Sequence, residues 1–255
     1  MITLKGKNYK NTDELFHDAI AMNLDISDIE KVKFEKYARL QKVSQALQLP
    51  TPLAVLEIRV KNPNQAERGQ LKISDSWVRN QYCRQQQCMA LANFIGTTFG
   101  NSYYVLKPTG GLVLSDYDAL HFGGSPETVC GYYAAGGDIS TGIVVGTGIT
   151  AESLDSYVLT TPIANGTVSG KLSYNACGVT KTWSSPTWTA AWVRIINNNS
   201  GGTITVNECV LYTQLNYQAP YGASFMMNRD KLSSGEAILD AGQLTVTYNI
   251  VITFP

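Results

Sequence analysis

Histidine, the side chain that most often performs acid–base chemistry and binds metal ions, is scarce in this chain of 255 residues. There are only two histidines, His17 and His121. His17 is expected within a helix, where a surface or packing role is commoner than catalysis. His121 follows Asp116 and Asp118, so an acid, a base or a metal ligand could lie there. However, the glycine and the glutamate that a calcium loop needs are not at the required offsets from these aspartates.

The cysteines do not form a recognisable metal motif. Cys83 and Cys88 are separated by four residues instead of two, and no nearby histidine completes a zinc set. The chain has an odd number of cysteines and no apolar leader, which fits free, buried thiols in a reducing compartment. The full set is Cys83, Cys88, Cys130, Cys177 and Cys209.

Two sequence motifs of nucleophilic and phosphate chemistry are also missing. The chain has no GxSxG elbow, and no Lys-Ser or Lys-Thr follows Gly146-Thr147-Gly148 at the distance of a phosphate loop. We therefore expect no catalytic residue, no cofactor site and no metal site, and predict that the protein is not an enzyme.

One pair of charged residues has a structural reason to meet. Two β-prone runs, 188–197 and 203–213, flank a loop that ends with Gly201 and Gly202, which predicts a hairpin. Glu208 then lies on the apolar face, where an unpaired carboxylate is costly. A turn near Ser200 places Arg194 diagonal to Glu208, so we predict a cross-strand ion pair between them. The alternative is a bulge that turns Glu208 outward.

The N-terminal region is expected to be helical. Asn11 and Ser27 each precede a glutamate by three positions, which predicts two capped helices, and the second can extend to about Leu49 before Pro50. Its apolar seam is interrupted by lysines at 33 and 36. An amphipathic helix packed on its own domain is the favoured interpretation, and a coiled coil is the alternative. The seam residues are Ile26, Ile29, Leu40, Val43 and Leu47.

The rest of the chain shows mostly strand patterns. Alternating residues predict strands over 53–61 and 244–254, shorter strands at 70–73, 142–146, 171–174 and 225–227, a hairpin over 102–114 and a helix over 75–95. The predicted fold is α+β, with N-terminal helices and hairpins followed by an antiparallel β-sandwich of the jelly-roll or immunoglobulin-like kind. The predicted regions are 1–52 (helical docking), 53–140 (mixed) and 141–255 (β-sandwich).

Charge is unevenly distributed although the formal net charge is zero. Residues 1–90 hold 14 basic and 10 acidic side chains, and residues 91–255 hold 6 and 10. No apolar stretch approaches the ~20 residues that span a bilayer. We therefore expect neither nucleic acid nor a membrane as a partner. The charge-poor second half is expected to be covered by partner subunits or to rely on its amides and hydroxyls for solubility.

The C-terminal half resembles a known family. In order, it contains GIVVGTG (142–148), LDSY (154–157), IANGT (163–167), KLSY (171–174), RIINNNSGGTITVNECVLY (194–212), NRD (228–230) and LTVTYNIVI (244–252). This series is similar to a group of tailed-bacteriophage virion proteins with an all-β C-terminal domain. The family pattern has glycine after Val-Asn-Glu, whereas this chain has Cys209 and Val210, which leaves the packing of that strand open.

The resemblance implies a role without catalytic residues. It predicts a structural component of the virion, associated with the capsid, neck or tail and assembled in the cytoplasm of the host bacterium. Its expected partners are other virion proteins and further copies of itself. The alternative is a receptor- or carbohydrate-binding module of a fibre or tail, in which loop aromatics stack on sugars. The candidate aromatics are Trp183, Trp188, Tyr103, Tyr104, Tyr132, Tyr133, Tyr217 and Tyr221.

Overall fold

The computed structural model describes residues 2–4, 7–78, 82, 102–106, 112–116, 130–215 and 223–255. The chain divides into two compact units made of separated segments. Unit 1 comprises Met1–Asp75, Gly166–Thr205 and Glu236–Pro255, and unit 2 comprises Ser76–Asn165 and Val206–Gly235. This division differs from the three consecutive regions that the sequence suggests, because strands from both ends of the chain share one sheet.

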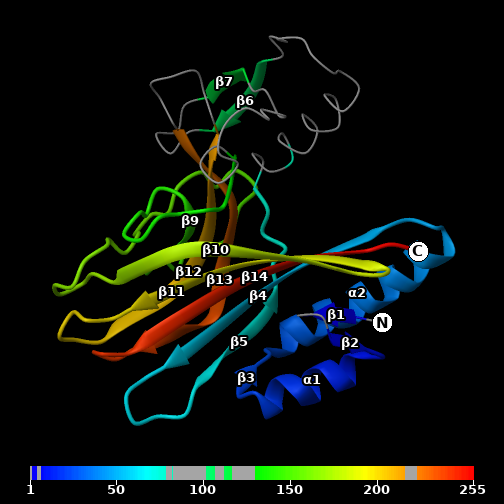
Figure 1. The fold of residues 1–255 in the computed structure, drawn as a ribbon, viewed down its shortest axis with the longest axis horizontal. Coiled ribbons are helices and arrows are strands. Elements are labelled where there is room, and N and C mark those ends of the chain that lie inside the picture. The colour runs from blue at the N-terminus through cyan, green and yellow to red at the C-terminus, as the bar shows by residue number, and fades with distance from the viewer. Residues whose placement is uncertain are drawn as a thin grey trace. The chain divides into compact units, whose positions relative to one another are not determined.

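Unit 1 is built on a six-stranded sheet of order β10-β11-β14-β4-β5-β3 (Figure 1). The central pair, β4 (Thr51–Lys61) and β14 (Gln243–Thr253), is antiparallel along its whole length. β14 also pairs with β11 (Thr187–Asn197), which pairs with the edge strand β10 (Ser173–Ser184). On the other side β4 pairs with β5 (Arg68–Ile73), and β3 (Leu24–Asp25) joins β5 in parallel.

Two helices cover one face of this sheet. α1 (Thr12–Ala21) begins after Asn11, whose side chain accepts a hydrogen bond from the Glu14 amide, and α2 (Asp28–Ala46) begins after Ser27 in the same way. Both predicted N-caps are confirmed. A hydrophobic cluster joins the helices to the sheet and to β2 (Lys7–Tyr9), which pairs with β1 (Ile2–Leu4). Its buried members include Leu15, Phe34, Tyr37, Leu53, Val55, Leu71 and Val251.

An exposed ion pair also links β2 to α1. The Lys7 ammonium donates to the Asp18 carboxylate at 2.6 Å, and the Tyr9 hydroxyl donates to the same oxygen at 2.8 Å. These donors, the lysine first, hold the pKa of Asp18 below its ordinary value. The stability that they contribute is therefore lost when acid protonates Asp18.

Unit 2 contains the second sheet, of order β13-β12-β8, in which β9 also pairs with β12. Its long strands are β12 (Ile204–Leu215) and β13 (Ala223–Ile238), and its short ones are β8 (Cys130–Gly131) and β9 (Gly142–Gly146). The last residues of β13 and the first two of β12 belong to unit 1. β6 (Ser102–Leu106) and β7 (Leu112–Asp116) form the separate two-stranded hairpin expected from the sequence.

The described residues are mostly β, so the α+β prediction needs correction. The strands predicted at 53–61, 70–73, 142–146 and 225–227 are confirmed within β4, β5, β9 and β13, and the one predicted at 244–254 is confirmed as β14, which ends at Thr253. The stretch predicted at 171–174 only begins a longer strand, β10, and the predicted helix over 75–95 lies almost wholly outside the described residues.

The predicted hairpin between 188–197 and 203–213 is wrong. β11 and β12 do not pair: β11 is hydrogen-bonded to β10 on one side and to β14 on the other, while β12 lies in the second sheet. β10 and β14 each pair with β11 over most of its length. These two long ladders satisfy its backbone groups more completely than a local hairpin could.

Candidate functional site

Unit 2 contains a buried ion pair between Arg229 of β13 and Glu208 of β12. The guanidinium Nε donates to Glu208 Oε2 at 2.8 Å, and Nη2 lies 2.7 Å from the same oxygen. The two side chains are 4% and 0% exposed, respectively. Charges so far from water are tolerated only when they are paired and hydrogen-bonded, and here they are both.

The remaining donors of Arg229 hold the chain that follows β9. Nη1 donates to the Ala151 carbonyl at 2.9 Å, and Nη2 donates to the Thr150 carbonyl at 3.1 Å and to its hydroxyl at 2.7 Å. The Gly148 amide donates to Glu208 Oε1 at 3.1 Å. We call these five residues, Gly148, Thr150, Ala151, Glu208 and Arg229, the Arg229 clasp. It fastens one loop to two strands.

The glycines of the GIVVGTG segment make room for the clasp. Gly146 lies directly opposite Glu208 in the β9–β12 ladder. A Cβ at Gly146 would come within 2.6 Å of Glu208 Oε1, and a Cβ at Gly148 would overlap the same oxygen. The Gly-Thr-Gly sequence that lacks a phosphate-loop lysine therefore has a packing role: it admits a carboxylate between two strands.

Further bonds tie the same region together. The side-chain amide of Asn207 donates to the Thr147 carbonyl at 2.8 Å, and the backbone amide of Leu159 donates to the Tyr212 hydroxyl at 3.0 Å. Burial raises the pKa of Tyr212 to about 12, although the Leu159 hydrogen bond acts in the opposite direction. The phenol therefore stays neutral at ordinary pH.

The predicted ion pair between Arg194 and Glu208 is not formed. Glu208 is buried, so the outward bulge is also wrong, and its cationic partner is Arg229. Arg194 is buried in unit 1, where its Nε donates to the Asn175 carbonyl at 2.8 Å and its guanidinium lies 4.9 Å from the centre of the Tyr174 ring. The pairing failed because the hairpin that would have brought the two residues together does not exist.

Arg229 was missed by sequence reasoning although a signal was present. It occurs in the NRD segment, which directly follows the apolar Phe225–Met227 within β13. A cation that continues an apolar run into the protein interior needs a carboxylate nearby. With only ten acidic residues after position 90, Glu208 was among the few candidates.

The Asn-rich loop between β11 and β12 is a turn, as predicted, but its two glycines differ. Gly201 has a φ of 79°, whereas Gly202 is not in the left-handed region. The loop is organised by Asn198, which donates to the Gly202 and Ile238 carbonyls at 2.7 Å each. The Gly201 amide donates to Asp240 at 2.8 Å. Asn198 is thus a structural residue that the turn motif concealed.

Among the residues that the structure describes, the other candidates are not gathered into a site. His17 is exposed on α1, and Cys177 and Cys209 are buried and form no disulfide. His121, Asp118, Cys83 and Cys88 lie outside the described residues, and so do Tyr217 and Tyr221. Within the described part of the chain, no group of three or more His, Cys, Asp or Glu side chains could hold a metal ion.

A shallow hollow borders the loop between β4 and β5. It contains neither a carboxylate nor a histidine, so it lacks the groups of a general acid–base pair. Its lining residues are Lys61, Asn62, Pro63, Asn64, Gln65, Ala241 and Gln243.

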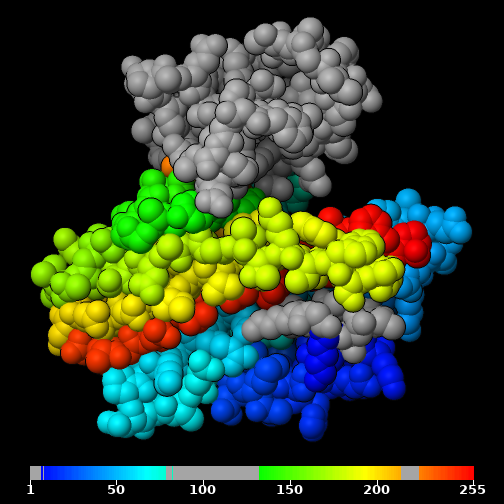
Figure 2. All heavy atoms as spheres, viewed as in Figure 1, coloured from blue at the N-terminus to red at the C-terminus, as the bar shows by residue number. Residues whose placement is uncertain are grey.

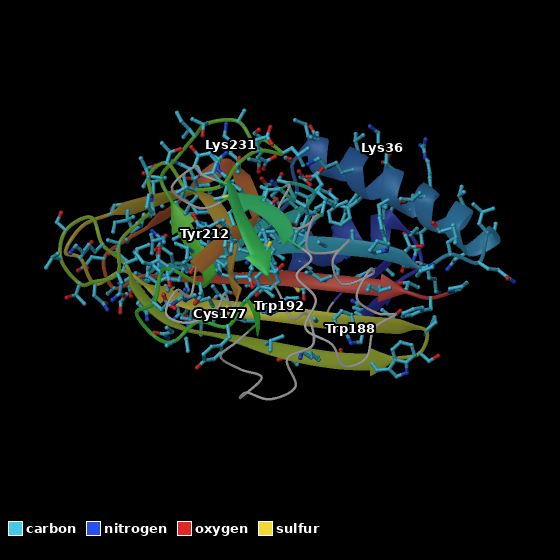
Figure 3. The ribbon with its side chains drawn as sticks, turned by 90° about the horizontal axis from the view of Figure 1, so that it is seen from above. Lys36, Cys177, Trp188, Trp192, Tyr212 and Lys231 are labelled. Atoms are coloured by element: carbon cyan, nitrogen blue, oxygen red, sulfur yellow. The ribbon has the colours of Figure 1, made fainter. Side chains whose placement is uncertain are left out.

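Unit 1 carries an exposed aromatic group at one end of its sheet. Trp183 of β10 is 61% exposed and packs against Phe254, which is 40% exposed, with 5.7 Å between ring centres. Trp188 of β11 is the register partner of Trp183 and is half-buried. The exposed run of β10 is visible in Figure 2, and Figure 3 labels Trp188 on β11. Of the other candidates, Tyr132 is buried and Tyr133 is exposed.

Comparisons with protein-family models, with curated proteins and with solved structures found no match to this chain. Among the described residues, no helix has both the length and the apolar character to span a bilayer.

Proposed function

We propose that the protein is a non-enzymatic structural component of a bacteriophage virion, associated with the capsid, neck or tail. On this proposal it is assembled in the cytoplasm of the host bacterium, as an oligomer that contacts other virion proteins through its sheets and helices. The virion assignment rests on the sequence resemblance of residues 142–252. Neither nucleic acid nor a membrane is proposed as a partner.

The observation that supports a structural role is the Arg229 clasp. A catalytic ion pair must meet its substrate, but both charges of this pair are enclosed, and their hydrogen bonds are used to fix a loop. Such a cluster stabilises one conformation and offers no open position to a reactant. The β-sandwich of the jelly-roll or immunoglobulin-like kind remains part of this proposal, beyond the mostly β architecture described above.

Two measurements test the role. Light scattering of the purified protein over a wide concentration range should show an oligomer, and imaging of intact particles at chain-tracing resolution should show repeated copies. A monomer at every concentration, together with absence from particles, would contradict the proposal.

The aromatic group at Trp183 favours a second candidate function, binding of cell-surface carbohydrate. Exposed aromatic faces suit the apolar faces of sugar rings, and Trp183 and Phe254 present such faces next to each other. A glycan array should then give a signal that Trp183→Ala abolishes. Tyr82→Ala, which removes an exposed aromatic ring that is not among the candidate sugar-binding residues, is the matched control and should leave the signal unchanged.

A further inference from the structure

Helix α2 has an apolar stripe on the side away from its packed face. Its five apolar members are between 49 and 72% exposed, and Lys36, also exposed, is the one polar residue within the stripe. In Figure 3, Lys36 lies on the side of α2 turned away from the sheet. The stripe consists of Ile29, Val32, Lys36, Leu40 and Val43 of α2, together with Leu47, the C-cap residue that follows the helix.

The spacing of the stripe is an 11-residue repeat. Ile29, Val32 and Lys36 recur as Leu40, Val43 and Leu47, each exactly eleven positions later in the sequence. Eleven residues in three turns give about 3.67 residues per turn, close to the roughly 3.6 of a straight α-helix. The stripe therefore stays on one side of the helix over its whole length of about 27 Å.

The core does not explain this stripe, because the helix uses another face for packing. Phe34, Tyr37 and Gln41 are buried, and α2 contacts β4 and β5. A helix that needs only one buried face ordinarily has polar residues on the others. A second apolar stripe on an exposed helix indicates a contact surface for another protein.

We infer that the stripe of α2 pairs with the same stripe of a second copy of this chain, with the two helices antiparallel. This inference deepens the proposed function and rests on it for the expectation that copies meet during assembly. Along the helix axis, the midpoint of the stripe is at the level of residue 38. Around that point Ile29 faces the partner's Leu47, and Val32 faces the partner's Val43.

The position of Lys36 selects the antiparallel arrangement. In a parallel pair of identical helices Lys36 would face the partner's Lys36, so two like charges would meet in an apolar seam. In the antiparallel pair Lys36 faces the partner's Leu40. Its methylene groups can then pack on that leucine while the ammonium reaches water.

The charges beside the stripe are complementary in the same arrangement. Glu35, Arg39 and Lys42 are all exposed on one flank of the stripe, with the acid toward the N-terminus and the bases toward the C-terminus. An antiparallel pair keeps the two flanks on the same side and brings Glu35 close to the partner's Lys42. Because the contact is symmetric, each such ion pair occurs twice.

The test is sedimentation velocity of the full chain as a function of concentration. Wild type should dimerise, and Leu40→Glu should raise the dissociation constant at least about tenfold by placing a carboxylate in the seam. Val168→Glu, at an exposed apolar residue of unit 1 outside the stripe, is the matched control and should associate like wild type. Circular dichroism checks that both variants are folded.

A charge-reversal pair tests the orientation. Glu35→Lys and Lys42→Glu should each weaken association, and the double variant should restore it, because the antiparallel pair regains both opposite charges. Failure of the double variant to recover would overturn the antiparallel arrangement. If wild type oligomerises and Leu40→Glu has no effect, the α2 contact is wrong but the proposed assembly role stands. A wild type that stays monomeric at all concentrations would count against both.

Discussion

Replacing Glu208 with Gln should destabilise the protein by about 3–5 kcal/mol, the usual cost of breaking a buried ion pair. Glu208 accepts from Arg229 with one oxygen and from the Gly148 amide with the other. Glutamine keeps only one acceptor oxygen, so in either orientation its NH2 group must face one of the two donors, the Arg229 guanidinium or the Gly148 amide. The guanidinium, 4% exposed, cannot turn to water and remains an uncompensated charge.

A second buried carboxylate provides the comparison. Glu236 accepts from Arg68 Nη1 and from Gln70 Nε2, both at 2.7 Å, and it is nearly as buried as Glu208. Its cation differs, because the Arg68 side chain is 47% exposed. After Glu236→Gln the guanidinium can be rehydrated, so we expect a loss of only about 1–2 kcal/mol.

Urea unfolding followed by far-ultraviolet circular dichroism measures both losses as free energies of unfolding. The double variant Glu208→Gln/Arg229→Gln removes both charges and should be at least about 2 kcal/mol more stable than the sum of the single losses predicts. The reasoning is refuted if Glu208→Gln costs less than about 1 kcal/mol, or no more than Glu236→Gln, because burial of the cation would then not set the cost.

Three further outcomes follow from the structure. Gly148→Ala should destabilise by about 1–3 kcal/mol because its methyl group overlaps an anchored carboxylate, whereas Gly178→Ala, whose Cβ meets nothing within 4 Å, should be neutral in the same urea titration. Asn249 is buried, and its side-chain nitrogen and oxygen have no hydrogen-bond partner; Asn249→Leu should therefore stabilise by about 1–2 kcal/mol, while Asn62→Leu, which breaks hydrogen bonds, should destabilise. Because the folded-state pKa of Asp18 is depressed, wild type should lose more stability than Asp18→Asn as pH falls through the acid range below the ordinary aspartate pKa; equal losses in urea midpoints at each pH would contradict that.

Local signals predicted the elements well. The oxygens of Asn11 and Ser27 accept hydrogen bonds at the two helix starts, and the alternation over 244–254 became β14. Such signals act within a few residues, so neither requires knowledge of the rest of the fold. Glu30 shows their limit: its spacing predicts a capping box, but its carboxylate accepts from the Ile73 amide at 2.7 Å.

Local signals did not predict which cation pairs with Glu208 or which strands pair with β11. The sequence identifies Glu208 as a buried carboxylate that needs a cation, but the hairpin that it predicts points to Arg194 as the partner. The pairing of β11 with β10 and β14 excluded that hairpin, and β13 brought Arg229 to the site instead.

The sequence alone predicted the two capped helix starts, the strands β4, β5, β9 and β14, the Asn-rich turn, and the need to neutralise Glu208, since these depend on local conformation and on the cost of burying charge. Only the tertiary structure decided that β4 and β14, almost 200 residues apart, lie side by side, that Arg229 meets Glu208, and that the apolar stripe of α2 faces solvent. The physical reason is that strand pairing, and the burial that follows from it, depends on which strand pairs hydrogen-bond the most backbone N–H and C=O groups over the whole chain. A short window of sequence does not contain that information.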